Sequence, residues 1–110
     1  MAFTVNLYVE AGATFSREIT YTNADGSVFD LTDYTAELQV RETAASASAV
    51  ITKTPGINTT TGVVSWTFTA TETALLTASK YVWAIELTHT DGTVLRFVEG
   101  DITVSPEVVR

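Results

Sequence analysis

Apolar and polar residues alternate at every second position through much of this chain, and this period of two limits the secondary structure that the chain can form. In the segment 34–41, Tyr34, Ala36, Leu38 and Val40 alternate with polar residues. Successive side chains of a β-strand point to opposite faces, so this pattern predicts a strand with one buried face. A chain made of such segments must pair them into sheets and bury their apolar faces against one another.

Other segments show the same alternation and are predicted strands. Their expected inward residues are Phe3, Val5, Leu7 and Val9; Phe15, Ile19 and Tyr21; Val64, Trp66, Phe68 and Ala70; and Tyr81, Trp83, Ile85 and Leu87. A last strand is predicted over about 93–104. Within it Leu95 and Phe97 are at odd positions, whereas Ile102 and Val104 are at even ones, so the apolar side must change near Gly100. This predicts a β-bulge at that glycine.

Turn-forming residues separate these segments. Asp25–Gly26 and Asp91–Gly92 each lie between apolar runs, and the second pair predicts a β-hairpin. The segments 43–48 and 55–62 are rich in small and polar residues and are predicted loops or irregular edges.

Helix is predicted only at 69–76, where Thr69 and Glu72 have capping-box spacing. Ala74, Leu75 and Leu76 are expected to plug one end of the fold. The sequence therefore predicts a single all-β domain over residues 1–110, a sandwich of about seven short antiparallel strands with one short helical turn. A small barrel is the alternative.

Composition and charge restrict the classes of partner. The net charge is −7, and the six Lys and Arg residues are scattered singly, so nucleic acid and anionic membranes are poor partners. Cysteine is absent, which excludes disulfides and thiolate catalysis. Residues 1–9 lack the features of a secretory signal, and no stretch reaches the roughly 18 apolar residues of a membrane span. We expect a soluble protein made in a cytoplasm.

Residues that could carry catalysis or bind a metal are few. His89 is the single histidine and is expected to be a solvent-facing loop residue beside a turn. Most carboxylates fall on polar strand positions or in turns, where a structural role is favoured over paired acid-base catalysis. Asp30, Thr32 and Asp33 lie close together but lack the spacing of a calcium loop. The prediction is a protein that is not an enzyme and has no cofactor and no metal site.

Aromatic residues and the chain ends are the candidates for binding. Trp66 and Trp83 share the apolar parity of their strands, which favours the core over a sugar-stacking surface. Tyr8 lies on the polar parity of its strand and is a candidate interface residue. The C-terminal segment after Pro106 supplies the other candidate interface residues, which are Glu107, Val108, Val109 and Arg110.

Several phrases of this sequence are more specific than generic β-structure. They are Glu10–Phe15, Asp25–Gly26, Phe29–Ala36 with Leu38–Glu42, Tyr81–Leu87 and Val98–Arg110. In their order and spacing they resemble a family of short proteins from tailed-phage structural gene clusters, which is itself similar to the N-terminal domain of phage baseplate upper proteins. Members tend to have Gly where Asp33 stands and Thr where Val109 stands.

The resemblance implies an immunoglobulin-like antiparallel β-sandwich that serves as a structural component of the virion. The favoured hypothesis is a tail, baseplate or fibre-attachment module that works by protein–protein assembly with other virion proteins. Identical copies are expected in closed, threefold or sixfold arrangements. The alternatives are a capsid decoration (cement) protein and, from another class, a carbohydrate-binding host-recognition domain that uses Trp66, Trp83 or Tyr8.

Overall fold

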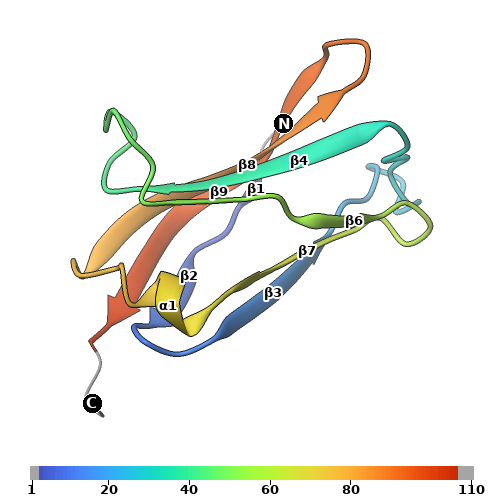
Figure 1. Cartoon of the computed structure of the whole chain (residues 1–110). Helices are drawn as coiled ribbons and strands as arrows, with labels where there is room; N and C mark the ends of the chain where they lie inside the picture. The colour runs from blue at the N-terminus through green and yellow to red at the C-terminus, as the bar shows by residue number, and fades with distance from the viewer. Residues whose placement is uncertain (1–2, 107–110) are drawn as a thin grey trace.

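The computed structural model describes residues 3–106, which form two β-sheets packed face to face as a sandwich (Figure 1). The larger sheet has the strand order β1-β9-β8-β4-β5, with β2 also beside β9, and the smaller has the order β3-β7-β6. The strands are β1 (Phe3–Thr4), β2 (Leu7–Glu10), β3 (Phe15–Thr20), β4 (Tyr34–Arg41), β5 (Ile51–Lys53), β6 (Gly56–Asn58), β7 (Val63–Phe68), β8 (Lys80–His89) and β9 (Val94–Ser105). The predicted sandwich is confirmed at the level of two packed sheets, and the barrel is not formed.

The first and last strands run parallel, against the expectation of a wholly antiparallel fold. Both β1 and β2 pair with β9 in parallel, whereas the other pairs are antiparallel. Parallel neighbours cannot be joined by a tight hairpin, and here they come from opposite ends of the chain. Alternation identifies a strand but carries no information on which distant strand becomes its neighbour.

Most of the apolar residues that were predicted to face inward form the core between the two sheets. Leu38, Val64, Phe68, Ile85 and Leu87 have no exposed surface. Trp66 and Trp83 are buried, with 5% and 2% of their surface exposed, and their ring centroids lie 5.3 Å apart. The prediction that both tryptophans belong to the core is therefore confirmed. Phe3 and Ala70 are exceptions on the predicted inward faces: Phe3 is 44% exposed, and Ala70 is exposed as the first residue of the helical turn that follows β7.

The change of face in β9 occurs three residues earlier than predicted. Ile85 pairs with Val98 and Glu86 pairs with Arg96, which leaves Phe97 as an extra residue in β9. Phe97 and Val98 are consecutive and both fully buried, so the bulge lies here and the prediction of a bulge at Gly100 is wrong. Gly100 instead permits a close approach by the N-terminal segment: a Cβ at this position would overlap the backbone of Val5.

Two short strands were not predicted. Residues 51–53 form β5 at one edge of the larger sheet, and residues 56–58 form β6 at one edge of the smaller sheet, within the segment that was predicted to be a loop or an irregular edge. Three residues are too few to show alternation, and both strands form because a longer neighbour offers them its edge. The predicted loop at 43–48 and the hairpin turn at Asp91–Gly92, where Gly92 has φ of 95°, are confirmed.

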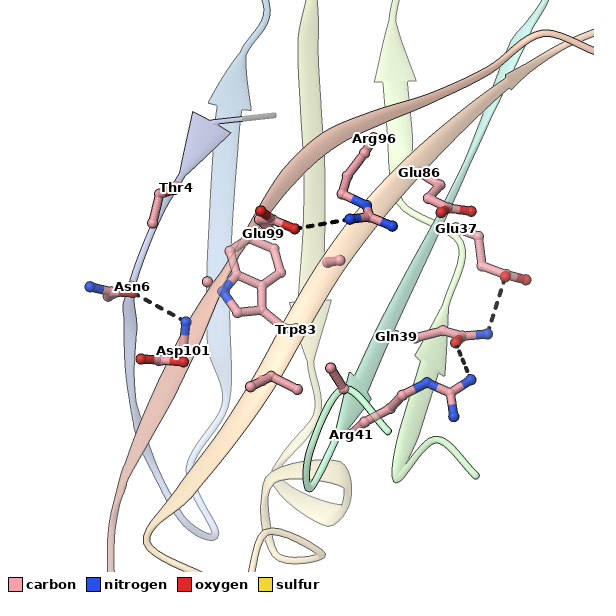
Figure 2. A pocket seen from close by; sticks show the side chains of 14 residues that line it. Thr4, Asn6, Glu37, Gln39, Arg41, Trp83, Glu86, Arg96, Glu99 and Asp101 are labelled. Atoms are coloured by element: carbon pink, nitrogen blue, oxygen red, sulfur yellow. Dashed lines mark hydrogen bonds and ion pairs between the residues drawn. The ribbon is translucent and has the colours of Figure 1, made fainter. Parts of the chain in front are cut away.

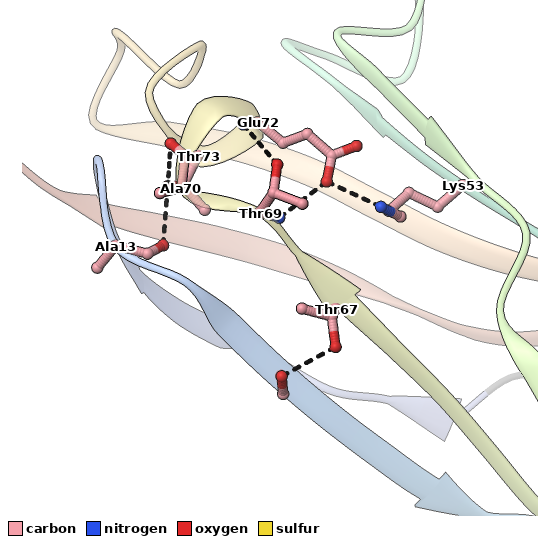
Figure 3. A network of polar contacts seen from close by, with 8 residues as sticks. Ala13, Lys53, Thr67, Thr69, Ala70, Glu72 and Thr73 are labelled. Atoms are coloured by element: carbon pink, nitrogen blue, oxygen red, sulfur yellow. Dashed lines mark hydrogen bonds and ion pairs between the residues drawn. The ribbon is translucent and has the colours of Figure 1, made fainter.

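The predicted helical turn is α1 (Ala70–Thr73), which lies at one end of the sandwich (Figures 1 and 3). Thr69 and Glu72 form the predicted capping box. The Glu72 carboxylate also pairs with the Lys53 ammonium at 2.8 Å, and the Thr73 hydroxyl donates to the Ala13 carbonyl at 2.8 Å (Figure 3). These contacts attach α1 to β5 of the larger sheet and to the connection between β2 and β3.

The plug at this end is smaller than predicted. Leu76 is buried, but Leu75 is 53% exposed and Ala74 is also exposed. The helix ends after a single turn, so only one of the three side chains reaches the core. Within residues 3–106 no helix has the length and apolar character of a membrane span.

Candidate functional site

A polar groove with a volume of about 500 Å³ lies on the outer face of the larger sheet (Figure 2). It follows β8, the middle strand of this face. The groove exists because β8 places the short side chains of Val82 and Ala84 outward, while the flanking strands place long ones beside them. Glu37, Gln39 and Arg41 of β4 form one wall; Arg96, Glu99 and Asp101 of β9, with Thr4 and Asn6, form the other.

The β4 wall is a chain of hydrogen bonds. Arg41 donates through Nη2 to the Gln39 amide oxygen at 2.7 Å and through Nη1 to the Ser46 carbonyl at 2.8 Å. The Gln39 Nε2 in turn donates to Glu37 at 3.2 Å (Figure 2). Arg41 is thereby held along the sheet and fixes the loop that follows β4.

The β9 wall is joined to the N-terminal segment. The Asp101 N–H donates to the Asn6 side-chain oxygen at 3.1 Å, and the Val5 N–H donates to the Glu99 carbonyl at 2.9 Å. Beneath this crossing the Trp83 indole N–H donates to the Val5 carbonyl at 3.0 Å. The absence of a side chain at Gly100 lets Val5 come this close, so the glycine shapes one end of the groove.

The groove has a surplus of acidic groups at its β4–β8 side. Glu37 and Glu86 are directly opposite each other on adjacent strands, an arrangement in which like charges repel. Arg96 lies opposite Glu86 on the other side, yet its guanidinium makes its ion pair with Glu99 at 3.3 Å. All these side chains are at or near the surface, where water screens the charges and single ion pairs contribute little to stability.

The carboxylates with perturbed pKa values lie elsewhere and hold turns. Hydrogen bonds from Ser27 lower the pKa of Asp25, those from Thr32 lower the pKa of Asp30, and those from Thr93 lower the pKa of Asp91. The Glu72 pKa is lowered by the hydrogen bond from Lys53 and then by the Thr69 backbone amide. In each case the ionised form is a hydrogen-bond acceptor for local backbone structure.

His89 is placed differently from the prediction of a solvent-facing loop residue. It is the last residue of β8 and is partly buried, with its ring centroid 4.8 Å from that of Tyr34. Its Nδ1 accepts the Asp91 N–H at 3.2 Å. The hairpin brings β8 and β9 together directly after His89, so the strand extends further toward the turn than the polar sequence suggests.

The residues weighed as calcium ligands do not form a cluster. The Asp30 carboxylate accepts the Thr32 N–H at 3.0 Å, and Asp33 has a positive φ of 65° in the turn that leads into β4. Among residues 3–106, no three His, Asp or Glu side chains come together in a way that could hold a metal ion.

The predicted interface residues divide into two groups. Tyr8 lies in β2 on the same outer face as the groove and is 74% exposed. Glu107, Val108, Val109 and Arg110 lie outside the described residues.

Sequence reasoning assigned Glu37 and Glu86 to polar strand faces but did not identify the groove. The sequence does place two short side chains, Val82 and Ala84, at consecutive outward positions of one strand. This signal is weak alone, because the long side chains that form the walls can be assigned to the groove only once the strand order is known.

The groove offers hydrogen-bond donors, acceptors and charges of both signs, and its long side chains bond mainly to one another. This arrangement suits contact with a polar surface or chain. No protein-family model matches this chain, and no curated protein matches it.

Proposed function

We propose that this chain is a non-enzymatic structural component of a tailed-bacteriophage virion. In this proposal it is a tail, baseplate or fibre-attachment module that works by protein–protein assembly with other virion proteins. The observation that carries the assembly role is the outer face of the larger sheet, where a polar groove of about 500 Å³ lies on the same face as the exposed Tyr8. Interfaces of non-obligate complexes are about as polar as the rest of a protein surface and are enriched in tyrosine.

We also propose that the sandwich is immunoglobulin-like. In a variable-type immunoglobulin sandwich, strands C, F and G and the added C′ share one sheet, while B, E and D share the other. Here β4, β8, β9 and β5 share one sheet, and β3, β7 and β6 share the other. The seven strands from β3 to β9 follow that scheme in chain order, which supports this topology.

The virion part of the proposal rests on the sequence resemblance. Its phrases fall on defined elements of this fold: Asp25–Gly26 is a turn, 29–36 leads into β4, and 98–105 is most of β9. The net charge of −7 is consistent with the proposal that neither nucleic acid nor membrane is a partner.

Locating the protein in a reconstruction of the phage particle tests this function. We expect density for this sandwich at the tail, baseplate or fibre attachment, with a copy number in the tens or fewer. Copies spread over the head lattice would overturn the tail assignment and support the capsid decoration alternative. Absence of the chain from purified particles would overturn the virion assignment altogether.

Host carbohydrate binding is the alternative from another class. With both tryptophans in the core, an exposed aromatic ring on the groove face is supplied by Tyr8. Titration of the protein with host polysaccharide, followed by NMR, tests this alternative. Shifts at Tyr8 and along the groove that disappear in Tyr8→Ala would favour it over assembly, and no shifts would remove it.

A further inference from the structure

Five of the strands, β1, β2, β3, β5 and β6, lie at an open sheet edge, and they differ in whether another strand can add to them. An open edge presents unpaired backbone N–H and C=O groups, and proteins protect such edges with inward-pointing charges, prolines or very short strands. Comparing the edges therefore shows which one is available.

Edges β3 and β5 each carry an inward-pointing cation. Arg17 of β3 is directly opposite the buried Trp66, so its side chain starts on the core side of the smaller sheet. Lys53 of β5 is opposite the buried Leu38 and pairs with Glu72. An added strand would have to desolvate these charges. Edge β1 has only two residues. Edge β6 has only three and directly follows Pro55, which has no N–H to donate.

Edge β2 has none of these protections. Its inward residues, Leu7 and Val9, are apolar and buried, and its outward Tyr8 is 74% exposed. It pairs with β9 on one side, and no strand of residues 3–106 pairs with its other side.

The backbone of β2 has its free groups at Tyr8. The Val5 and Ala11 N–H groups both donate to β9, at 2.9 Å each. Backbone groups alternate between the two sides of a strand, so 5, 7, 9 and 11 face β9, whereas 6, 8 and 10 face outward. The Glu10 carbonyl already accepts the Ala13 N–H at 3.1 Å, which leaves Tyr8 with both its N–H and C=O directed to the open side.

We propose that the open edge of β2 binds the β2 strand of a second copy of this chain, in antiparallel register with Tyr8 opposite Tyr8. This inference rests on the proposed function, because it names the edge through which the module assembles with itself. The register is self-complementary. It sets Leu7 against Val9 on the core side and Asn6 against Glu10 on the outer side, so no like charges oppose each other. Tyr8 then forms a hydrogen-bonded pair with its copy, and the two larger sheets become one.

The contact is isologous, with a twofold axis at Tyr8, and a twofold contact combines with a threefold axis in dihedral assemblies. A four-residue edge gives a small interface, and small interfaces are weak. We therefore expect an equilibrium between monomer and dimer that depends on concentration, and many copies held on a particle would shift it toward the dimer.

Sedimentation of the whole chain tests the dimer. We expect the average mass to rise from 11.8 kDa toward twice that value as the concentration increases to about 1 mM. In Tyr8→Pro the outward N–H is lost, while the ladder to β9 keeps its bonds, and the dimer should weaken at least about tenfold. In Tyr8→Thr the N–H remains, so self-association should persist. A wild-type chain that stays monomeric up to this concentration overturns the proposal.

Cysteine crosslinking tests the register and does not depend on whether the proline variant folds. The chain has no cysteine, so Tyr8→Cys introduces a single thiol at the twofold axis. Hydrogen-bonded antiparallel partners have Cα atoms about 5.5 Å apart, within the range for a disulfide. Thr103→Cys is the matched control, because Thr103 is the exposed neighbour of Tyr8 on β9 and would lie three strand spacings, about 14 Å, from its copy.

Under mild oxidation we expect a covalent dimer for Tyr8→Cys and none for Thr103→Cys. Equal crosslinking of both, or of neither, overturns the register. A chain that is monomeric in solution but present in purified particles would refute the β2 contact and leave the proposed function standing. A chain that dimerises through β2 but is absent from particles would support the β2 contact and refute the proposed function.

Discussion

Replacing Gly100 with alanine tests the packing of the N-terminal segment against β9. A Cβ at position 100 would lie 2.7 Å from the Val5 carbonyl carbon and closer still to its oxygen, and 3.2 Å from the Asn6 side-chain oxygen. The obstacle is mainly backbone, so no side-chain rotation relieves it. The segment between β1 and β2 must move away from β9.

The expected cost has two sources. Forcing a methyl group into a packed site typically costs about 1–3 kcal/mol. Moving the Val5 carbonyl also breaks or stretches its 3.0 Å hydrogen bond from the Trp83 indole, and a buried N–H left without a partner costs about 1–3 kcal/mol. We expect Gly100→Ala to lower the free energy of unfolding by about 3 kcal/mol, with a fall in Tm of roughly 4–8 °C for each kcal/mol.

Urea unfolding followed by tryptophan fluorescence measures this cost. Gly56→Ala is the matched control, because a Cβ there meets only Ser65, with Oγ at 3.7 Å and the carbonyl oxygen at 3.9 Å, which are ordinary contacts. The control should lie within about 0.5 kcal/mol of the wild type. A Gly100→Ala variant as stable as Gly56→Ala would refute the close approach of Val5.

A double-mutant cycle separates the two sources. Trp83→Phe removes the indole N–H and with it the hydrogen bond to Val5. In that background Gly100→Ala has no such bond to break, so it should cost less. We expect the double variant to be more stable than the sum of the single effects predicts, by about 1 kcal/mol. Full additivity would show that displacement of the Val5 carbonyl is not part of the cost.

Three further predictions concern single side chains. Glu86→Gln removes the repulsion from Glu37 and should raise the free energy of unfolding by about 0.2–0.5 kcal/mol at low salt. The control is Glu18→Gln, because Glu18 lies opposite a serine and its replacement should not stabilise the fold. Equal effects of the two changes in chemical denaturation would refute the repulsion. Because the folded pKa of Glu72 is lowered, its charge stabilises the fold above its ordinary pKa of 4.5, and this contribution is lost as pH falls through the folded pKa. Glu72→Gln should therefore be less stable than the wild type at pH 7, with the two unfolding curves converging in acid; a constant difference from pH 7 to 3 would contradict this. Thr73→Val loses the hydrogen bond to the β2–β3 connection and should cost about 1 kcal/mol in urea unfolding, and an unchanged midpoint would argue against that bond.

The elements that depend on interactions between residues close together in the chain were predicted from the sequence. The alternation in 34–41 predicted the buried face of β4, Asp91–Gly92 predicted the hairpin turn, and Thr69 with Glu72 predicted the capped helical turn. Each depends on residues only a few positions apart, within one strand, turn or helix.

The groove and the position of the β9 bulge could not be predicted in this way. Glu37 and Arg96 face one groove because β4 and β9 flank β8, and strand order is set by contacts between distant segments. The change of parity in β9 fits a bulge anywhere between Phe97 and Gly100. Packing against β8 places it at Phe97, which leaves Gly100 to meet Val5.

Residues close together in this chain were enough to predict short strands with one apolar face, two tryptophans in the core, and the turns between the best-defined strands. The packing of the whole chain sets the parallel pairing of the N-terminal strand with β9, the two three-residue strands that complete the sheets, and the open edge of β2 at Tyr8. The reason is physical: side-chain alternation and turn geometry act over a few residues, whereas the choice of neighbouring strand depends on how the two apolar faces bury each other.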